Sequence, residues 1–197
     1  MVWPSDLVQI AGGFLSMNSK TDAFRAINYL MVTQEPDGHW SQNMWLSGRP
    51  NGLGIQRDQI ALPILLVNLC STNGALDPHM IHSYWNIVKK AVSYIIKYGP
   101  ATSQDRWEEE SGISVFTLAT EIAALLAAAD FAEKNNEPGI AAYCRETADY
   151  WNENIERWTY VTDTPLANEV GVEGYYIRIN PTGLAAKGLN GKSMRIK

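Results

Sequence analysis

The stretch of this chain that is best suited to chemistry is Arg106-Trp107-Glu108-Glu109-Glu110, which lies between a polar loop and a long Ala/Leu-rich segment. An indole face stacks on a pyranose ring, and a desolvated carboxyl group can keep its proton and deliver it to a glycosidic oxygen. Clustered glutamates before a helix also occur simply because they favour the positive end of the helix dipole and sit in water. The pattern makes carbohydrate the first substrate class to consider, and the rest of the chain decides between the two interpretations.

Helices must position these side chains, and apolar periodicity with Pro, Asp and Gly punctuation predicts six of them. They cover about residues 3–17, 21–33, 58–70, 79–98, 114–134 and 138–158. Pro63 predicts either a kink or a later start in the third helix. A long Gly/Pro/Asn-rich loop over 34–56 precedes that helix, and the chain from about residue 162 looks extended and irregular.

The pattern of loop, helix, short turn and helix recurs three times at a period of roughly fifty residues, which is typical of stacked helical hairpins. Such hairpins cannot bury their apolar faces singly, so the sequence predicts an all-α class, an α/α toroid or solenoid of about three hairpins. Chemically loaded residues recur at one place in each unit: Trp3 and Asp6, then Trp45, Arg57 and Asp58, then Trp107, Glu108 and Glu109. If the odd-numbered helices form a parallel inner ring, these side chains gather at one end of the ring. We call that end the rim.

Composition supports one domain with a real core and argues against two classes of partner. The 197 residues are 46% apolar and 19% charged, with a net charge of −5 and no Lys/Arg cluster. Nucleic acid and anionic membranes are therefore poor partners. The longest apolar run, 122–129, is too short to span a bilayer, and no export signal is visible in the chain as given, which leaves localisation open.

The cysteines and histidines indicate no metal site. Cys70 and Cys144 each lie in an apolar helical pattern, which predicts buried free thiols rather than a disulfide. His39, His79 and His82 show no ligand spacing with them. We therefore expect no metal and no cofactor.

Five ordered blocks resemble the bacterial glucoamylase and glucodextranase family, glycoside hydrolase family fifteen. They are Val2-Trp-Pro-Ser-Asp-Leu, Pro36-Asp-Gly-His-Trp-Ser-Gln-Asn-Met-Trp45, Gln56-Arg-Asp-Gln-Ile-Ala-Leu-Pro63, Gln104-Asp-Arg-Trp-Glu-Glu-Glu-Ser-Gly112 and Glu121-Ile-Ala. The segment 171–181 also resembles the linking segment of that family. The similarity covers nearly the whole chain.

The resemblance implies an (α/α)6 barrel that removes glucose from the non-reducing ends of α-glucans with inversion. Glu108 matches the general acid of the family, Glu109 a carboxylate that binds the neighbouring sugar, and Asp6 an aspartate that grips the terminal glucose. The aromatic walls of the pocket are matched by Trp3, Trp45 and Trp107. Arg57 and Asp58 fall in a further block of the family pattern, without a defined role.

Two departures from the family pattern shape the expected function. Ser5 stands where a basic residue normally precedes the aspartate of the first block, which removes a charged donor. Inversion also needs a second carboxylate about 6.5–9.5 Å from the acid, and in this family the base comes from the later part of the barrel. We therefore expect half of a catalytic domain, inactive by itself. The alternative is a non-catalytic glucoamylase-like module that binds glucan or regulates a partner.

Several residues also have ordinary structural interpretations. Trp40 suits either a pocket rim or a loop anchor, Asp58 could be an N-cap with Arg57 as its surface neighbour, and Asp6 could be a first-turn partner of the helix dipole. Trp85, Trp151 and Trp158 have the spacing of packing residues. In half a toroid, apolar side chains at the two open ends would lack part of the neighbouring helices that bury them. These side chains are Leu7, Ile10, Phe14, Leu118, Ile122 and Leu125. Self-association, or binding of the remaining half of the barrel, would cover them.

Overall fold

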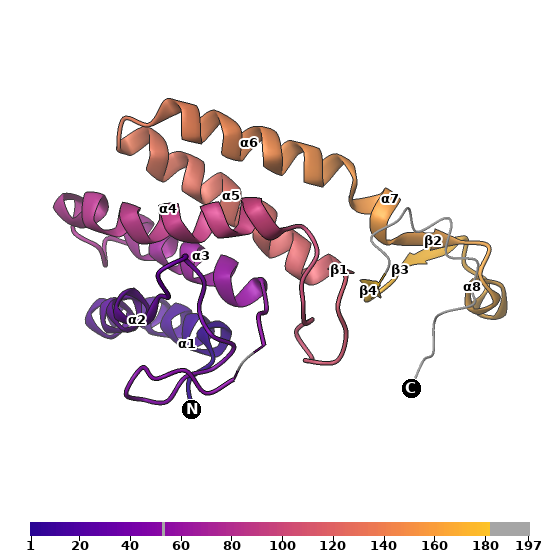
Figure 1. Ribbon diagram of the computed structural model, residues 1–197, viewed down its shortest axis with the longest axis horizontal. Helices are drawn as coiled ribbons and strands as arrows, with labels where there is room; N and C mark the ends of the chain where they lie inside the picture. Colours follow the sequence, from indigo (N-terminus) through magenta and orange to yellow (C-terminus); the bar gives the residue numbers. More distant parts are fainter. Residues whose placement is uncertain (53, 182–197) are drawn as a thin grey trace.

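The computed structural model describes residues 1–52 and 54–181, in which six long helices form two layers (Figure 1). The inner layer contains α1 (Pro4–Ser16), α3 (Asp58–Thr72) and α5 (Val115–Lys134), each packed on the next. The outer layer contains α2 (Lys20–Thr33), α4 (Ile81–Tyr98) and α6 (Pro138–Glu153). Since α2 packs on α1 and α3, α4 on α3 and α5, and α6 on α5, the predicted succession of helical hairpins is confirmed.

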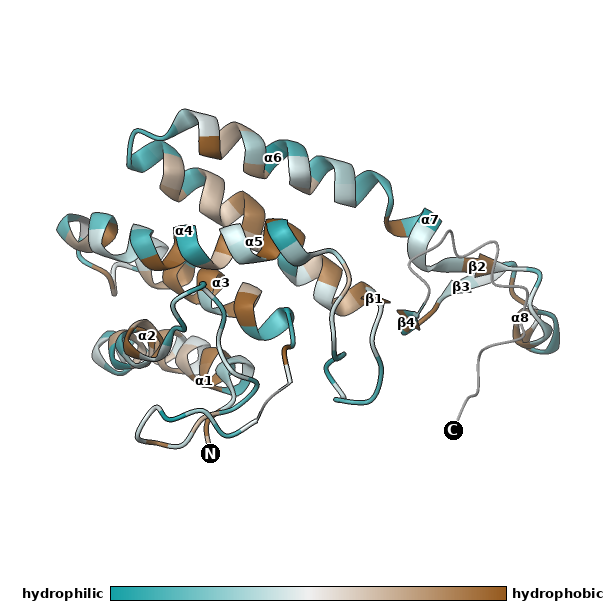
Figure 2. Ribbon diagram, in the orientation of Figure 1, coloured by the Kyte–Doolittle hydropathy of each residue, from teal (hydrophilic) through white to brown (hydrophobic). Residues whose placement is uncertain are grey.

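The two layers differ in how much of each helix is apolar. In α4 the buried side chains Trp85, Val88, Val92 and Ile95 recur at helical spacing, which leaves a polar face for solvent. In α3 and α5 buried residues lie on several sides, because α3 packs against α1, α2, α4 and α5, and α5 packs against α3, α4 and α6. Figure 2 shows this contrast as brown segments along α5 and teal ones along α6.

Prolines occur at two kinds of position in these helices, at the start and in the interior. Pro4 and Pro138 occupy the first positions of α1 and α6, where a missing backbone N–H matters least. Pro63 lies within α3, which nevertheless begins at Asp58. The predicted later start of the third helix is therefore wrong.

A short 3-10 turn, η1 (Pro78–Met80), leads into α4. The sixth predicted helix is divided into two. A separate helix, α7 (Ile155–Thr159), follows the end of α6. The Asn154 side-chain amide donates to the carbonyl of Tyr150 at 2.8 Å. That bond gives the carbonyl a local partner in place of the next helical N–H, a competition typical of asparagine.

The segment after α7 is folded, so the predicted irregular tail from about residue 162 is wrong for the described part. It contains β2 (Tyr160–Thr162), α8 (Pro165–Val170), β3 (Gly174–Tyr176) and β4 (Ile179–Asn180). β2 pairs antiparallel with β3, and β4 with β1 (Ile113–Ser114). Elements of two to six residues are too short to show periodicity in a sequence. Residues 182–197 of that predicted tail lie outside the described part.

The expected gap in apolar cover is only partly present. Leu118 and Leu125 are fully buried in the main core, so that part of the expectation is wrong, whereas Ile10 is 55% exposed. Within the described ranges, α5 alone has the length and apolar composition to cross a membrane, and more than half of that span is buried in the fold. Cys70 and Cys144 are buried and free, as predicted.

Candidate active site

Three inner helices begin on the same side of the protein. The backbone N–H of Ser5 in α1 donates to Gln59 Oε1 in α3 at 2.6 Å. Arg57, just before α3, places its Nε 3.8 Å from Glu121 Oε1 of α5. The loops that precede these helices therefore meet at one rim, as a parallel inner ring requires.

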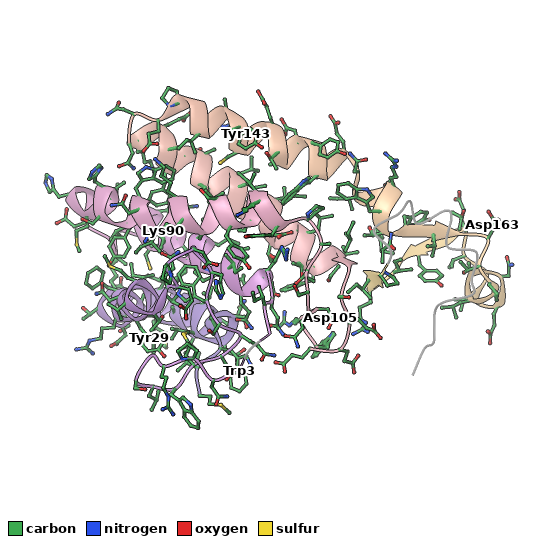
Figure 3. All side chains as sticks on the ribbon, in the orientation of Figure 1. Trp3, Tyr29, Lys90, Asp105, Tyr143 and Asp163 are labelled. Carbon is green, nitrogen blue, oxygen red and sulfur yellow. The ribbon has the colours of Figure 1, made fainter. Side chains whose placement is uncertain are left out.

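Glu108, the general-acid candidate, contacts Trp3, the residue that directly precedes the first helix. Trp3 Nε1 donates to Glu108 Oε1 at 3.4 Å, although the two residues are 105 positions apart in the chain. Glu108 has a φ of 64°, in the left-handed region, and its N–H donates to the carbonyl of Asp105 at 2.9 Å. Non-glycine residues in this conformation store strain and cluster at functional sites. In Figure 3 the labelled Trp3 and Asp105 lie on the same lower side of the helices.

Two further tryptophans, Trp45 and Trp107, have exposed indole rings in the loops that precede α3 and α5. Trp45 is 43% exposed and follows Met44, which forms a two-bond antiparallel bridge with Val2, the residue before Trp3. Trp107 is 66% exposed beside Glu108. Large exposed aromatic rings suit stacking on sugar rings. Asp6 is exposed in the first turn of α1.

Asp105 organises the loop that carries the glutamates. We define the acid loop as residues 99–112; an antiparallel bridge between Thr102 and Gly112 closes it. The Asp105 side chain is buried, and its Oδ1 accepts from the N–H groups of Glu109 at 3.0 Å and Glu110 at 3.4 Å. Its Oδ2 lies 2.6 Å from Arg178 Nη1, which also contacts Glu109 Oε2 at 3.1 Å. The sequence reasoning missed Asp105 and Arg178.

Arg57, Asp58 and Glu121 form a buried charged cluster behind the rim. The Arg57 guanidinium donates to the carbonyl of Tyr98 and faces Glu121. Burial raises the pKa of Asp58 to about 6. Burial also raises the pKa of Glu121 well above its ordinary value, although the positive charge of Arg57 opposes this rise. The pKa of Arg57 is itself lowered by burial. The surface interpretation of Arg57 is wrong, and Arg57 rather than Asp58 occupies the N-cap position. Substrate binding by this pair stays a prediction.

Glu121 was named only as the start of a sequence block and given no role, although the sequence carries a signal for one. A single carboxylate stands within a run of Ala and Leu in α5, and it is fully buried. Carboxylates are almost never fully buried without a partner, so such a residue indicates a paired or functional group.

Trp40 is a loop anchor, and the rim alternative is wrong. Its ring is buried, and its Nε1 donates to the carbonyl of Leu30 in α2 at 2.8 Å. It therefore fixes the long loop after α2 to the helical layer. In the described part of the chain, no three His, Cys, Asp or Glu side chains are grouped as a metal ion would require.

Comparison with known families and structures identifies the family and the fold of the chain. The model of glycosyl hydrolases family 15 matches residues 38–195. The chain belongs to glycosyl hydrolases family 15. Its similarity to a glucoamylase from Clostridium sp. (strain G0005) is 37% identity over 179 residues, covering 91% of this chain and 24% of that protein.

A second relative, an uncharacterized glycosyl hydrolase from Methanocaldococcus jannaschii, is 26% identical over 168 residues, covering 82% of this chain and 26% of that protein. This family-15 chain thus spans about a quarter of the length of the curated relatives it matches.

Solved glucoamylase structures show the same helical arrangement. A bacterial glucoamylase complexed with acarbose superposes with a TM-score of 0.82 at 37% identity, over 93% of this chain and 25% of that one. Glucoamylase from Saccharomycopsis fibuligera matches with a TM-score of 0.60 at 19% identity, over 77% and 39%, and shows the fold alone. The expected α/α toroid class is confirmed.

Proposed function

We propose that this family-15 chain forms the acid-bearing side of a glucoamylase-type site, which releases glucose from the non-reducing ends of α-glucans with inversion. Glu108 is the general acid. The observation that carries the proposal is the hydrogen bond from Trp3 Nε1 to Glu108 Oε1, which brings an indole and a carboxyl group together on one rim. Membership of glycosyl hydrolases family 15 supports the reaction class.

The Trp3 contact also selects the oxygen that delivers the proton. An indole N–H can only donate, so the Glu108 oxygen that it contacts acts as an acceptor. The other oxygen, Oε2, then carries the transferable proton toward the glycosidic oxygen.

The remaining rim residues divide between stacking and hydrogen bonding. Trp45 and Trp107 supply exposed rings for the faces of the sugars, and Asp6 and Glu109 supply carboxylates for their hydroxyl groups. Arg57 and Asp58 act from beneath the rim in this proposal, since both side chains are buried.

The general base belongs, in this proposal, to a part of the family's barrel outside this chain. Inversion requires a second carboxylate about 6.5–9.5 Å from Glu108 with room for water. Without it the water is unactivated, and general acid–base help is worth roughly 10²–10⁴ in rate. We expect no measurable glucose release from maltose or starch by the chain alone. Release above that of the Glu108→Gln variant would contradict the placement of the base.

Sugar binding can be tested by NMR because the seven tryptophans form two groups. The indole N–H signals of the rim group, Trp3, Trp45 and Trp107, should shift on titration with acarbose or maltose. The signals of the buried group, Trp40, Trp85, Trp151 and Trp158, should stay fixed and serve as the internal control. Cellobiose, the β-linked isomer of maltose, should have little effect. Rim signals that ignore all three sugars, or respond equally to cellobiose, would contradict an α-glucan site.

A further inference from the structure

We propose that Arg178 is the positioning residue of the acid loop: it holds the turn that carries Glu108 through Asp105, and it aims the carboxylate of Glu109 at the sugar. The first part concerns loop geometry alone. The second part rests on the proposed function, because it assigns a sugar to Glu109.

The turn depends on a single buried carboxylate. Asp105 accepts from the N–H groups of Glu109 and Glu110 through Oδ1, and its own N–H donates to the carbonyl of Glu110 at 2.8 Å. Its carbonyl accepts from Glu108 at 2.9 Å. The backbone from 105 to 110 is therefore folded around Asp105, and whatever fixes Asp105 fixes the general-acid candidate.

Arg178 supplies the positive charge that this buried carboxylate needs. Asp105 is 2% exposed at its side chain, and Arg178 Nη1 contacts its Oδ2 at 2.6 Å. A charge-assisted bond of this length to a buried acceptor is stronger than an exposed ion pair. The same nitrogen reaches Glu109 Oε2 at 3.1 Å, but that carboxylate is 65% exposed. The contact with Asp105 therefore holds the arginine, and Glu109 is the group that the arginine places.

The acid loop also concentrates negative charge. Asp105, Glu108, Glu109 and Glu110 lie within six residues. Arg106, the arginine of the loop itself, has its guanidinium carbon 4.7 Å from the ring centre of Phe116 and 5.9 Å from that of Trp107. Arg178 comes from outside the loop and separates two carboxylates that would otherwise repel each other at short range.

The backbone on which Arg178 stands is fixed by strand pairing with the end of the loop. Arg178 directly precedes β4, which pairs with β1 immediately after the acid loop. Gly112 has a φ of 143°, and a Cβ on it would come within 2.2 Å of the Asn180 carbonyl oxygen. Asn180 in turn donates from Nδ2 to the carbonyl of Trp158 at 2.9 Å. This close approach sets the distance that the arginine side chain must span.

Amide hydrogen exchange tests the loop part directly in this chain. In Arg178→Met, the amides of Glu109 and Glu110 should exchange about tenfold faster or more, as loss of one charge-assisted hydrogen bond implies, with core amides of α3 and α5 unchanged. Arg178→Lys, which keeps the charge but not the fork, should restore part of the protection. Arg145→Met, which removes an exposed ion-pair partner of Asp130 and Glu133, is the matched control. Unchanged exchange in Arg178→Met would overturn the proposal.

A double-mutant cycle on acarbose affinity tests the second part. Arg178→Met should weaken binding several-fold in the unmutated chain and no further in the Glu109→Gln background, since its effect passes through Glu109. A loss of the same size in both backgrounds, or lower thermal stability with unchanged affinity, would show a merely structural residue. If acarbose shifts none of the rim tryptophans, the proposed function fails, and the exchange result still decides the loop.

Discussion

Arg57 and Glu121 face each other inside the protein, with Nε of the arginine 3.8 Å from Oε1 of the glutamate. They join the start of α3 to α5 directly behind the rim. In the described part of the chain, neither oxygen of Glu121 has a hydrogen-bond partner. The pair is thus held by charge and packing, and Arg57 is the cation that offsets a fully buried carboxyl group.

Replacing Arg57 with methionine should lower the free energy of unfolding by about 1–3 kcal/mol near neutral pH, because the carbonyl of Tyr98 loses its donor and Glu121 loses the positive charge that opposes the rise in its pKa. Urea unfolding measures the loss. Arg145→Met, at an exposed pair, should leave the same quantity nearly unchanged. Equal losses in the free energy of unfolding would show that the buried Arg57–Glu121 contact stabilises the protein no more than an exposed ion pair does.

Asp58→Asn should stabilise the protein at neutral pH. Burial raises the pKa of Asp58 from 3.8 to about 6, so between these values the folded state binds the proton that the unfolded state has released. Stability contributed by Asp58 therefore falls as pH rises from about 4 to 6 and stays low above it. The variant should be more stable by up to about 3 kcal/mol above pH 6 and match the unmutated chain below pH 4. Urea unfolding across this range checks it, and a difference that is independent of pH would contradict it.

Trp40→Phe and Trp45→Phe should affect different properties. Trp40→Phe removes the donor to the buried Leu30 carbonyl and leaves a cavity, so the free energy of unfolding should fall by about 2–4 kcal/mol. Trp45→Phe, at an exposed ring, should change it by about 0.5 kcal/mol at most but weaken acarbose binding. Thermal unfolding and sugar titration of both variants separate the two roles, and a reversed pattern would refute them.

Cys70 and Cys144 should resist thiol reagents in the folded protein. Burial raises the pKa of each thiol to about 11, and both side chains are fully buried, so thiolate is scarce and inaccessible. Labelling with a chromogenic disulfide should proceed only as fast as the chain opens, and urea should expose two thiols. Rapid labelling of either cysteine without denaturant would show an open path to the core.

The long helices were predictable because their signals are local. Pro4 and Pro138 mark starts, Gly99 follows the end of α4, and apolar spacing fixes the faces between. The recurrence of candidate site residues at equivalent places in the repeat predicts that they gather on one rim. Trp3 and Glu108 do meet, although their distance could come only from coordinates.

The contacts that were missed join residues far apart in the chain. Arg178 contacts Asp105 across 73 positions, and β1 pairs with β4 through only two residues each. No periodicity marks such pairs, and an arginine near the end of a polar segment looks like an ordinary surface residue. Glu121 differs, because a carboxylate inside the otherwise uncharged stretch 115–129 was visible and could have been interpreted as a buried partner.

The pairing of β1 with β4 also sets the order in which the parts can form during synthesis. Domains emerge from the ribosome with the N-terminal end first, and contacts of large sequence separation must wait for both partners. The α3–α5 layer can pack once residue 134 has emerged, whereas the strand that pairs with β1, directly after the acid loop, includes Asn180. A nascent chain can therefore close the acid loop through the Thr102–Gly112 bridge, but Asp105 and Glu109 lack their cation until the segment with Arg178 arrives. Among the described residues, the acid loop is therefore one of the last segments to gain all of its contacts.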